Sequence, residues 1–476
     1  MRLTPVHSGH KWLNQPQLER YNLLDCTTTA SMIGPMLAEL RDHKMDTFWK
    51  EEVWPLVSAV RGMQRRGLLV SERARVALRR RVRGDLEEVD AAILAADPSG
   101  QLAKPTDKYP NGLNATPRVA AFLYDQLGLK VPKRTAGKKP SVDQEALIRL
   151  WRDLRKKDEH ARPVLENLFH RSKLQTVDER YLEFFVHEDG RVRPSIKMIG
   201  TETLRFAYSD PPLQQITPEV RTLFHPAEGC VFLAADYSQL EARIQAHIAG
   251  VRRDLDILES GLDLHTLTAQ EIFEIPPEQW ADLDPAQAKG MRNYAKSFRY
   301  RLAYGGDPGQ LGQLGNKNFC PCPRCAHHAP PMVNLKPGTI TQAGQRFLGN
   351  RPEIEVWREA RLAEVRETRA LTVVGRRRYF FGPLSAVKRE VFNFPIQFLA
   401  AWRINRAMRE LHYRWGAPLV MQKHDELIAE VPTAEVEVWE DRMRRAMESP
   451  VEELGGVRFP VDVEVQSPWG VKRECP

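Results

Sequence analysis

Residues 231–248 read VFLAADYSQLEARIQAHI. The first five residues form a short apolar run, which is typical of a buried strand. From Ser238 to Ile248 the pattern predicts a helix. Asp236 would therefore stand at the carboxyl end of a buried strand, where the sheet holds a carboxylate in a fixed position.

A second acidic site is predicted far along the chain. Residues 419–422 and 427–431 are typical of two strands, and Lys423 to Glu426 lie between them. Asp425 would then lie in a hairpin turn beside Asp236. Lone aspartates are usually helix caps or turn residues, so the interpretation depends on the pair and on a third segment.

That third segment is a predicted helix with cations and phenols on one face. Arg292, Lys296, Tyr300 and Tyr304 recur every four residues, and Gly305-Gly306 then ends the helix. Arginine grips phosphate oxygens in pairs and lysine supplies a compact charge, so this face suits a triphosphate. The alternative is a solvated basic face, which the interleaved tyrosines disfavour.

In this order, the three segments resemble the motifs of family A DNA polymerases. The resemblance implies an α+β right-hand fold, with a palm built on an antiparallel sheet, helical fingers and a helical thumb. It also implies a template-directed enzyme that adds deoxynucleotides to a primer 3′-hydroxyl. Asp236 and Asp425 would bind two Mg²⁺ ions, which such enzymes place roughly 3.5–4 Å apart.

The resemblance assigns roles to further residues. Catalytic roles fall to Asp236, Asp425, Lys296 and Glu426. Nucleotide-binding roles fall to Arg292, Lys296, Tyr300, Tyr304, Glu241 and His265, and nucleic-acid contacts to Arg205, Arg389, Asn393, Gln397 and His424. The chain departs from the family pattern at Leu204, where a glycine is usual, and at Phe398-Leu399, where small residues are usual.

Two acidic positions bear on the substrate. Glu241 matches the family glutamate that blocks a ribose 2′-hydroxyl, and Glu426 also matches the DNA polymerase pattern. Single-subunit RNA polymerases share the layout and are the nearest alternative enzyme. A catalytically inactive, DNA-binding relative is the non-enzymatic alternative, and primer extension with magnesium would separate the three.

Composition is consistent with a nucleic-acid-binding protein. The chain has 476 residues, 42% of them hydrophobic, with a net charge of +8 and a pI near 9.1. Primer-template DNA and deoxynucleoside triphosphates are the expected partners. Neither a signal pattern nor a membrane span is apparent, so we expect a cytoplasmic protein, in the bacterial host cell if a bacteriophage encodes it.

The family order predicts five parts. Residues 1–50 would be a remnant of an exonuclease domain, 51–185 the start of the polymerase region and the thumb, and 186–262 the first part of the palm. Residues 263–388 would form the fingers, with a cysteine-rich insertion near 316–336, and 389–476 the second part of the palm.

The insertion carries candidate zinc ligands. Cys320, Cys322 and Cys325 are followed by His327 and His328, and the spacing of the last two cysteines is typical of zinc sites. Three cysteines and one histidine could form a tetrahedral site. A proline-rich loop with reduced thiols is the alternative.

The first fifty residues contain Tyr21 and Asp25, spaced as in the last motif of the family's 3′–5′ exonuclease. No earlier acidic motif of that exonuclease precedes them. The match is either a chance pattern on a helix or a remnant in a phage-type enzyme that lacks most of the exonuclease domain. In the second case, a separate exonuclease subunit would dock against residues 1 to about 50.

Overall fold

The largest sheet of the described residues is four-stranded and antiparallel in the computed structural model, which describes residues 15–307 and 337–473. Its strand order is β11-β6-β10-β9, with bounds Val461–Gln466, Cys230–Tyr237, Glu426–Pro432 and Leu419–Lys423. Residues 231–235 are buried, as expected for the apolar run. In the register of this sheet, Asp236 lies between Glu426 and Asp462.

Helices cover one face of this sheet. The 32-residue α16, Leu384–Trp415, packs on α17, Val436–Met447, and both contact β10. Helix α9, Leu240–Ala249, follows β6 and packs on α16. Because α9 begins at Leu240, the helix expected from Ser238 starts two residues later, after Gln239 adopts a left-handed conformation with φ 54°.

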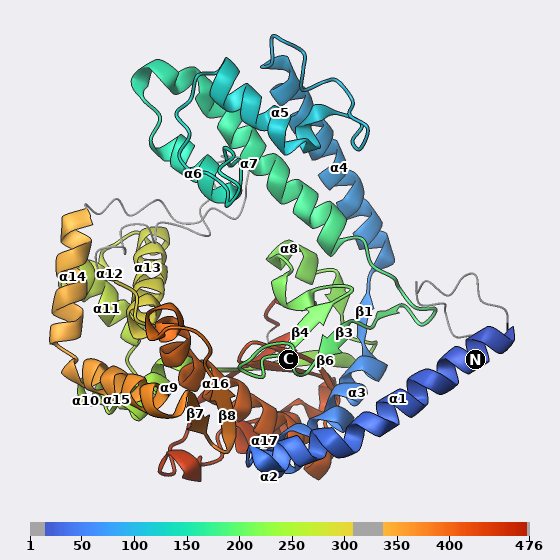
Figure 1. The fold of residues 1–476 in the computed structure, drawn as a ribbon, viewed down its shortest axis with the longest axis vertical. Helices are drawn as coiled ribbons and strands as arrows, with labels where there is room; N and C mark the ends of the chain where they lie inside the picture. The colour runs from blue at the N-terminus through green and yellow to red at the C-terminus, as the bar shows by residue number, and fades with distance from the viewer. Residues whose placement is uncertain (1–14, 308–336, 474–476) are drawn as a thin grey trace.

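A long helical arm rises from the sheet (Figure 1). Its two main helices, α4 (Glu72–Ala95) and α7 (Arg162–Thr176), pack against each other, and α5 (Thr116–Ala121) and α6 (Gln144–Arg152) lie near its far end. The Ser71 side chain caps α4 by accepting a hydrogen bond from the Ala74 amide at 3.3 Å. This arm lies within residues 51–185, where the sequence predicts the thumb, and is called the thumb below.

A second arm stands opposite the thumb and has a hydrophobic core of its own (Figure 1). It contains α10 (Arg252–Glu259), α11 (Leu264–Phe273), α12 (Pro277–Ala281), α13 (Pro285–Ala303), α14 (Pro337–Gly349) and α15 (Pro352–Thr368). The hairpin of β7 (Ala370–Val373) and β8 (Arg376–Tyr379) leads back to α16. These helices correspond to the fingers, and the sheet to the palm.

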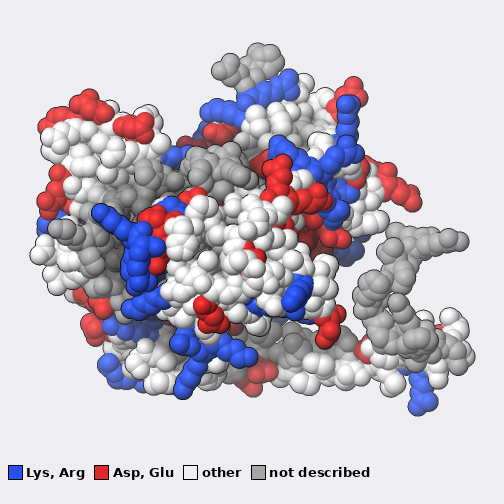
Figure 2. Space-filling model, turned by 90° about the horizontal axis from the view of Figure 1, so that it is seen from above, with Lys and Arg blue, Asp and Glu red and all other residues white. Residues whose placement is uncertain are grey.

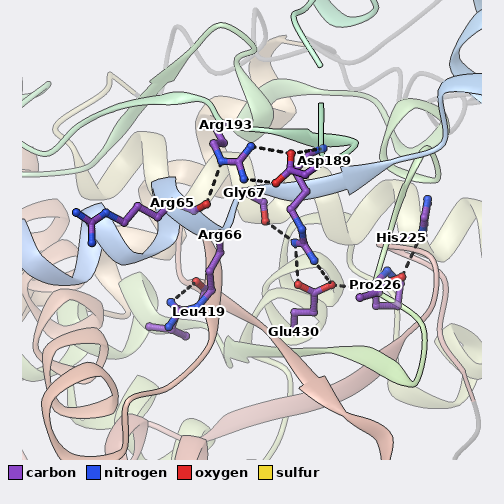
Figure 3. Close-up of polar contacts among 11 residues, drawn as sticks. Arg65, Arg66, Gly67, Asp189, Arg193, His225, Pro226, Leu419 and Glu430 are labelled. Atoms are coloured by element: carbon purple, nitrogen blue, oxygen red, sulfur yellow. Dashed lines mark hydrogen bonds and ion pairs between the residues drawn. The ribbon is translucent and has the colours of Figure 1, made fainter. Parts of the chain in front are cut away.

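A small sheet joins the thumb to the palm (Figure 3). Its order is β2-β1-β5, with bounds Arg191–Val192, Leu68–Val70 and Phe224–His225. Arg191 donates two hydrogen bonds, at 2.9 and 3.1 Å, to the Glu430 carboxylate on β10. Glu430 also accepts the Ala227 amide at 2.6 Å, so one partly buried carboxylate connects the base of the thumb to the palm sheet.

The remaining elements lie around the palm. They are α2 (Asp46–Phe48), α3 (Leu56–Arg66), α8 (Pro218–Arg221) and the hairpin of β3 (Ser195–Lys197) and β4 (Ala207–Ser209). Leu204, at the position where the family has glycine, has a left-handed φ of 57° and is buried. That conformation explains why glycine suits the position.

Helix α1, Gln15–Asp42, extends along the outside of the palm and buries none of its residues (Figure 1). It exposes seven large apolar side chains, which are Tyr21, Leu23, Leu24, Met32, Ile33, Met36 and Leu37. Within the described ranges, no helix is both long and apolar enough to cross a membrane.

Candidate active site

The two predicted acidic residues meet at one edge of the palm sheet. Asp236 is the next-to-last residue of β6, and Asp425 lies in the two-residue turn between β9 and β10. The Tyr237 amide donates a hydrogen bond to the Asp425 carbonyl at 3.3 Å. His424 takes the left-handed conformation, φ 57°, that the tight turn requires.

Burial raises the pKa of both carboxyl groups. Burial raises the pKa of Asp236 to about 7, with added repulsion from Asp425 and Glu426 and opposing attraction from Lys423 and Lys296. Burial likewise raises the pKa of Asp425. The Asp236 side chain is nevertheless reachable by solvent at the sheet edge, so a cation has access to it.

This donor set fits magnesium bound together with a substrate. Among the described residues, no three His, Cys, Asp or Glu side chains form a metal cage. Magnesium usually takes one or two carboxylates from the protein and completes its shell with water and phosphate oxygens. Two adjacent, repelling carboxylates therefore suit ions that arrive with a phosphate ligand.

Helix α13 faces these carboxylates with the predicted cations. Lys296 is exposed and lies near enough to Asp236 and Asp425 to lower the pKa of each. Arg292 donates hydrogen bonds at 2.6 and 3.1 Å to Asp263, the N-cap of α11. Although burial acts to raise it, the pKa of Asp263 is held at about 2 by the hydrogen bonds from Arg292 and Thr266.

His265 is a buried histidine with no hydrogen-bond partner among the described residues. It is 1% exposed, and both of its ring nitrogens lack a hydrogen bond. Burial lowers its pKa to about 3, with further repulsion from Arg299. Its ring meets Tyr300 edge-on, with centroids 5.8 Å apart. A neutral imidazole beside this cationic face is suited to donate to a bound phosphate.

A polar chain closes the other side of the site. The Tyr300 and Tyr304 rings stack with centroids 6.1 Å apart, and the Tyr304 hydroxyl donates to Glu241 on α9. Arg205 donates to the other oxygen of the Glu241 carboxylate. Burial raises the pKa of both tyrosines, so both remain protonated at neutral pH. Glu241 thus connects the palm, the end of α13 and Arg205.

Residues predicted to contact nucleic acid lie on α16 and in the hairpin of β9 and β10. Arg389, Asn393 and Gln397 follow one another at four-residue spacing on α16, and Arg389 and His424 are exposed. The Asn393 Oδ1 atom is buried without a partner. Elsewhere on the surface, Lys and Arg form separate groups interspersed with acidic residues (Figure 2).

The bulky pair after Gln397 is explained by packing. Phe398 is fully buried and stacks on Phe394 at 5.5 Å between ring centroids, with Phe48 of α2 at 5.9 Å on another side. Leu399 is 2% exposed. Both side chains therefore fill core space beneath the site.

The sequence interpretation missed two acidic partners. Asp263 holds Arg292, and Asp254 lies at the centre of a buried ion network with Arg299 and Arg351. Asp263 lies two residues before His265, which the family resemblance assigns to the nucleotide site. This proximity could have identified Asp263 as a candidate partner of Arg292. The cysteine cluster, Cys320, Cys322, Cys325, His327 and His328, lies outside the described residues.

Comparison with known families decides the relationship. The profile described as "DNA polymerase family A" matches residues 101–471. The chain belongs to DNA polymerase family A. This agrees with the resemblance of its motifs and with the mixed helical and antiparallel architecture.

Family A relatives include two bacterial enzymes of greater length. The chain is 32% identical over 390 residues to "DNA polymerase I, thermostable" of Thermus filiformis, covering 77% of this chain and 42% of the relative. It is 26% identical over 476 residues to "DNA polymerase I" of Geobacillus stearothermophilus, covering 95% and 49%. The chain thus spans about half or less of the length of these family A relatives.

A solved polymerase-domain structure shares the fold. The structure described as "POL domain of Pol1 from M. smegmatis complex with DNA primer-template and dNTP" superposes with a TM-score of 0.77 at 22% identity. The match covers 97% of this chain and 77% of the other. The predicted α+β right-hand fold is therefore confirmed.

Proposed function

We propose that this family A chain is a template-directed DNA polymerase that adds deoxynucleotides to a primer 3′-hydroxyl. One observation carries the proposal: the fold brings Asp236 and Asp425 together at a sheet edge beneath the cationic face of α13. The related enzymes named DNA polymerase I, and the neighbour described in complex with primer-template and dNTP, support the same activity.

Each side chain has a role in this proposal. Asp236 and Asp425 would hold two Mg²⁺ ions, which when bound stabilise the attacking and leaving oxygens of nucleotidyl transfer. Arg292 and Lys296 neutralise the triphosphate, and His265 donates to it. Glu241 would exclude a 2′-hydroxyl, and Tyr304 and Arg205 hold its carboxylate in place.

The remaining polar residues would contact the nucleic acid or support the catalytic turn. Glu426 is paired with Lys423 at 3.1 Å, next to the catalytic turn. Arg389, Asn393, Gln397 and His424 would contact the template and primer, since they lie on α16 and at the turn.

The deciding experiment is extension of a labelled primer on a DNA template with Mg²⁺. We expect extension with deoxynucleotides by the wild type and none by Asp236→Asn. Extension with ribonucleotides alone would favour the RNA polymerase alternative. DNA binding with no synthesis under any metal or nucleotide would favour the inactive relative.

Finer features of the enzyme are also proposed from the resemblance. The parts would be 1–50, 51–185, 186–262, 263–388 and 389–476, as in the family order. A phage-type enzyme is supported by Tyr300, since some phage relatives carry tyrosine there, and such an enzyme would act in the cytoplasm of the bacterial host. A structural Zn²⁺ ion would be held by Cys320, Cys322, Cys325 and His327.

We further propose that α1 receives a separate exonuclease subunit. In support, Tyr21 hydrogen-bonds Asp25 one turn later, and α1 leaves a row of apolar side chains exposed. The 476-residue chain alone would then lack 3′–5′ exonuclease activity. A mismatched, labelled primer with Mg²⁺ and no nucleotides tests this, and shortening that is lost in Asp25→Ala but kept in Asp425→Ala would contradict it.

A further inference from the structure

A buried ion network lies in the core of the fingers. The side chains of Asp254, Arg299 and Arg351 are each 2% exposed. Asp254 accepts from Arg299 at 2.5 Å and from Arg351 at 2.8 Å, one through each carboxylate oxygen. Arg299 also donates to the Thr268 hydroxyl at 3.1 Å, and Arg351 approaches Glu271 at 3.4 Å. The charges of the two carboxylates, Asp254 and Glu271, thus offset those of the two arginines.

The network joins four segments of the fingers. Asp254 belongs to α10, Thr268 and Glu271 to α11, and Arg299 to α13, while Arg351 is the N-cap residue of α15. The Phe347 ring of α14 lies under both guanidinium groups, 4.0 Å from that of Arg351 and 5.0 Å from that of Arg299. A single carboxylate therefore lies at the junction of the helices that surround α13.

The position of Arg299 on α13 gives this junction a link to the nucleotide site. Arg299 directly precedes Tyr300 and follows Lys296 by three residues, but it points into the core while Lys296 is exposed. Any rotation or shift of α13 that moved its cationic face would have to move Arg299 relative to Asp254. The buried face of α13, which carries Arg299, thus fixes the position of its exposed face, which carries Lys296.

The buried charges make the contacts of Asp254 with Arg299 and Arg351 strongly dependent on geometry. Buried guanidinium and carboxylate groups are tolerated only with partners in good geometry, and removal of one partner leaves an uncompensated buried charge. Burial acts to raise the pKa of Asp254, yet Arg299 and Arg351 hold it below its ordinary value. An apolar core would allow α13 to slide slightly. The contacts of Asp254 with both Arg299 and Arg351 oppose such sliding.

We propose that Asp254 is a positioning residue for the incoming nucleotide. By holding Arg299 and Arg351 together, it locks α13 to α10, α11 and α15, so that the fingers present Arg292, Lys296 and Tyr300 as one rigid surface. This inference rests on the proposed polymerase activity and adds a residue that touches neither nucleotide nor metal.

The test compares Asp254→Asn with Glu430→Gln in steady-state primer extension. Glu430 is a matched control, because its side chain is also mostly buried, at 9% exposure, and paired with arginine, but it lies at the junction of thumb and palm. We expect Asp254→Asn to raise the KM for the correct dNTP roughly tenfold, with kcat and the Kd for primer-template changed less than about twofold. Glu430→Gln should leave the KM for dNTP near the wild-type value.

A second variant keeps the test valid if Asp254→Asn fails to fold. The double variant Asp254→Asn/Arg299→Gln removes one charge of each sign, so Arg351 keeps Glu271 as its partner, and circular dichroism checks its folding. It should show the same rise in KM. An unchanged KM in a folded variant, an equal rise in Glu430→Gln, or unfolding of both variants would overturn the inference. Absence of extension by the wild type would instead refute the proposed function.

Discussion

The Tyr304 hydroxyl donates a hydrogen bond to Glu241, and so joins the end of α13 to α9 of the palm. Because Arg205 binds the other carboxylate oxygen, Glu241 is held from two sides at the position where a sugar would pass. This arrangement gives the first prediction a structural basis.

Glu241→Ala should raise incorporation of ribonucleotides relative to deoxynucleotides by roughly tenfold or more, because the steric block is removed. Competition between rCTP and dCTP in single-nucleotide extension measures the ratio. Tyr304→Phe keeps the carboxylate but removes the hydrogen bond, so its effect should be smaller. A wild-type ratio in Glu241→Ala would refute the role of this residue.

Removal of either carboxylate proposed to bind metal should abolish synthesis. Asp236→Ala and Asp425→Ala should each reduce Mg²⁺-dependent extension by at least ~10³-fold, while the Kd for primer-template stays within a few-fold of the wild type. Asp462→Asn provides the control, since Asp462 is the neighbour of Asp236 on β11 and has no assigned role. Robust extension by either alanine variant would exclude the assignment.

Magnesium should stabilise the chain more at pH 8 than at pH 6. The pKa of Asp236 is raised from its ordinary 3.8 to about 7, so between these values the folded chain binds a proton more tightly than the unfolded chain. Without metal, this group therefore lowers the free energy of unfolding as pH rises from about 4 to about 7.

Mg²⁺ competes with that proton, so its stabilising effect should grow as pH passes through 7. Thermal unfolding at both pH values, with and without Mg²⁺, measures the difference in Tm. Asp236→Asn should lose most of the pH dependence. An equal Mg²⁺ effect at pH 6 and pH 8 would contradict the raised pKa.

Tyr300 should govern the response to dideoxynucleotides. Its ring contacts those of His265 and Tyr304, with centroids 5.8 and 6.1 Å apart, on the face of α13 that would meet the sugar of a nucleotide. We expect the wild type to accept ddNTPs readily and Tyr300→Phe to discriminate against them. Chain-termination patterns at fixed ddNTP to dNTP ratios measure this, and identical patterns would refute it.

The cysteine-rich segment should bind zinc. Purified protein should carry about one zinc ion per chain, and Cys322→Ser should lose it. Inductively coupled plasma analysis after reducing, chelator-free purification gives the stoichiometry. Absence of zinc would leave the proline-rich loop as the better interpretation.

Local patterns were enough to predict that Asp236, Asp425 and the cationic face of α13 come together. Asp236 and Asp425 each follow an apolar strand, and the stripe on α13 repeats every four residues, so each signal lies within a few residues of chain. The resemblance to family A then predicted how these segments are arranged along the chain and in the fold.

The supporting ion pairs could not be predicted in this way. Asp254 meets Arg299 and Arg351 across 45 and 97 residues, and Asp263 meets Arg292 across 29. Such partners are set by how helices pack, and composition alone gives no pairing. The helix start after Asp236 was displaced for a related reason, since the Gln239 side chain accepts the Leu264 amide at 3.1 Å.

The small sheet at the base of the thumb has a consequence for changes in the length of the thumb. Strand β1 leads into the thumb and β2 leads out, and the two pair with Leu68 opposite Val192. Residues 71–190 therefore begin and end at neighbouring points on the same small sheet, beside the Arg191–Glu430 contact. A change in length within residues 71–190 can therefore leave the strand order of the palm and the positions of its two aspartates unchanged.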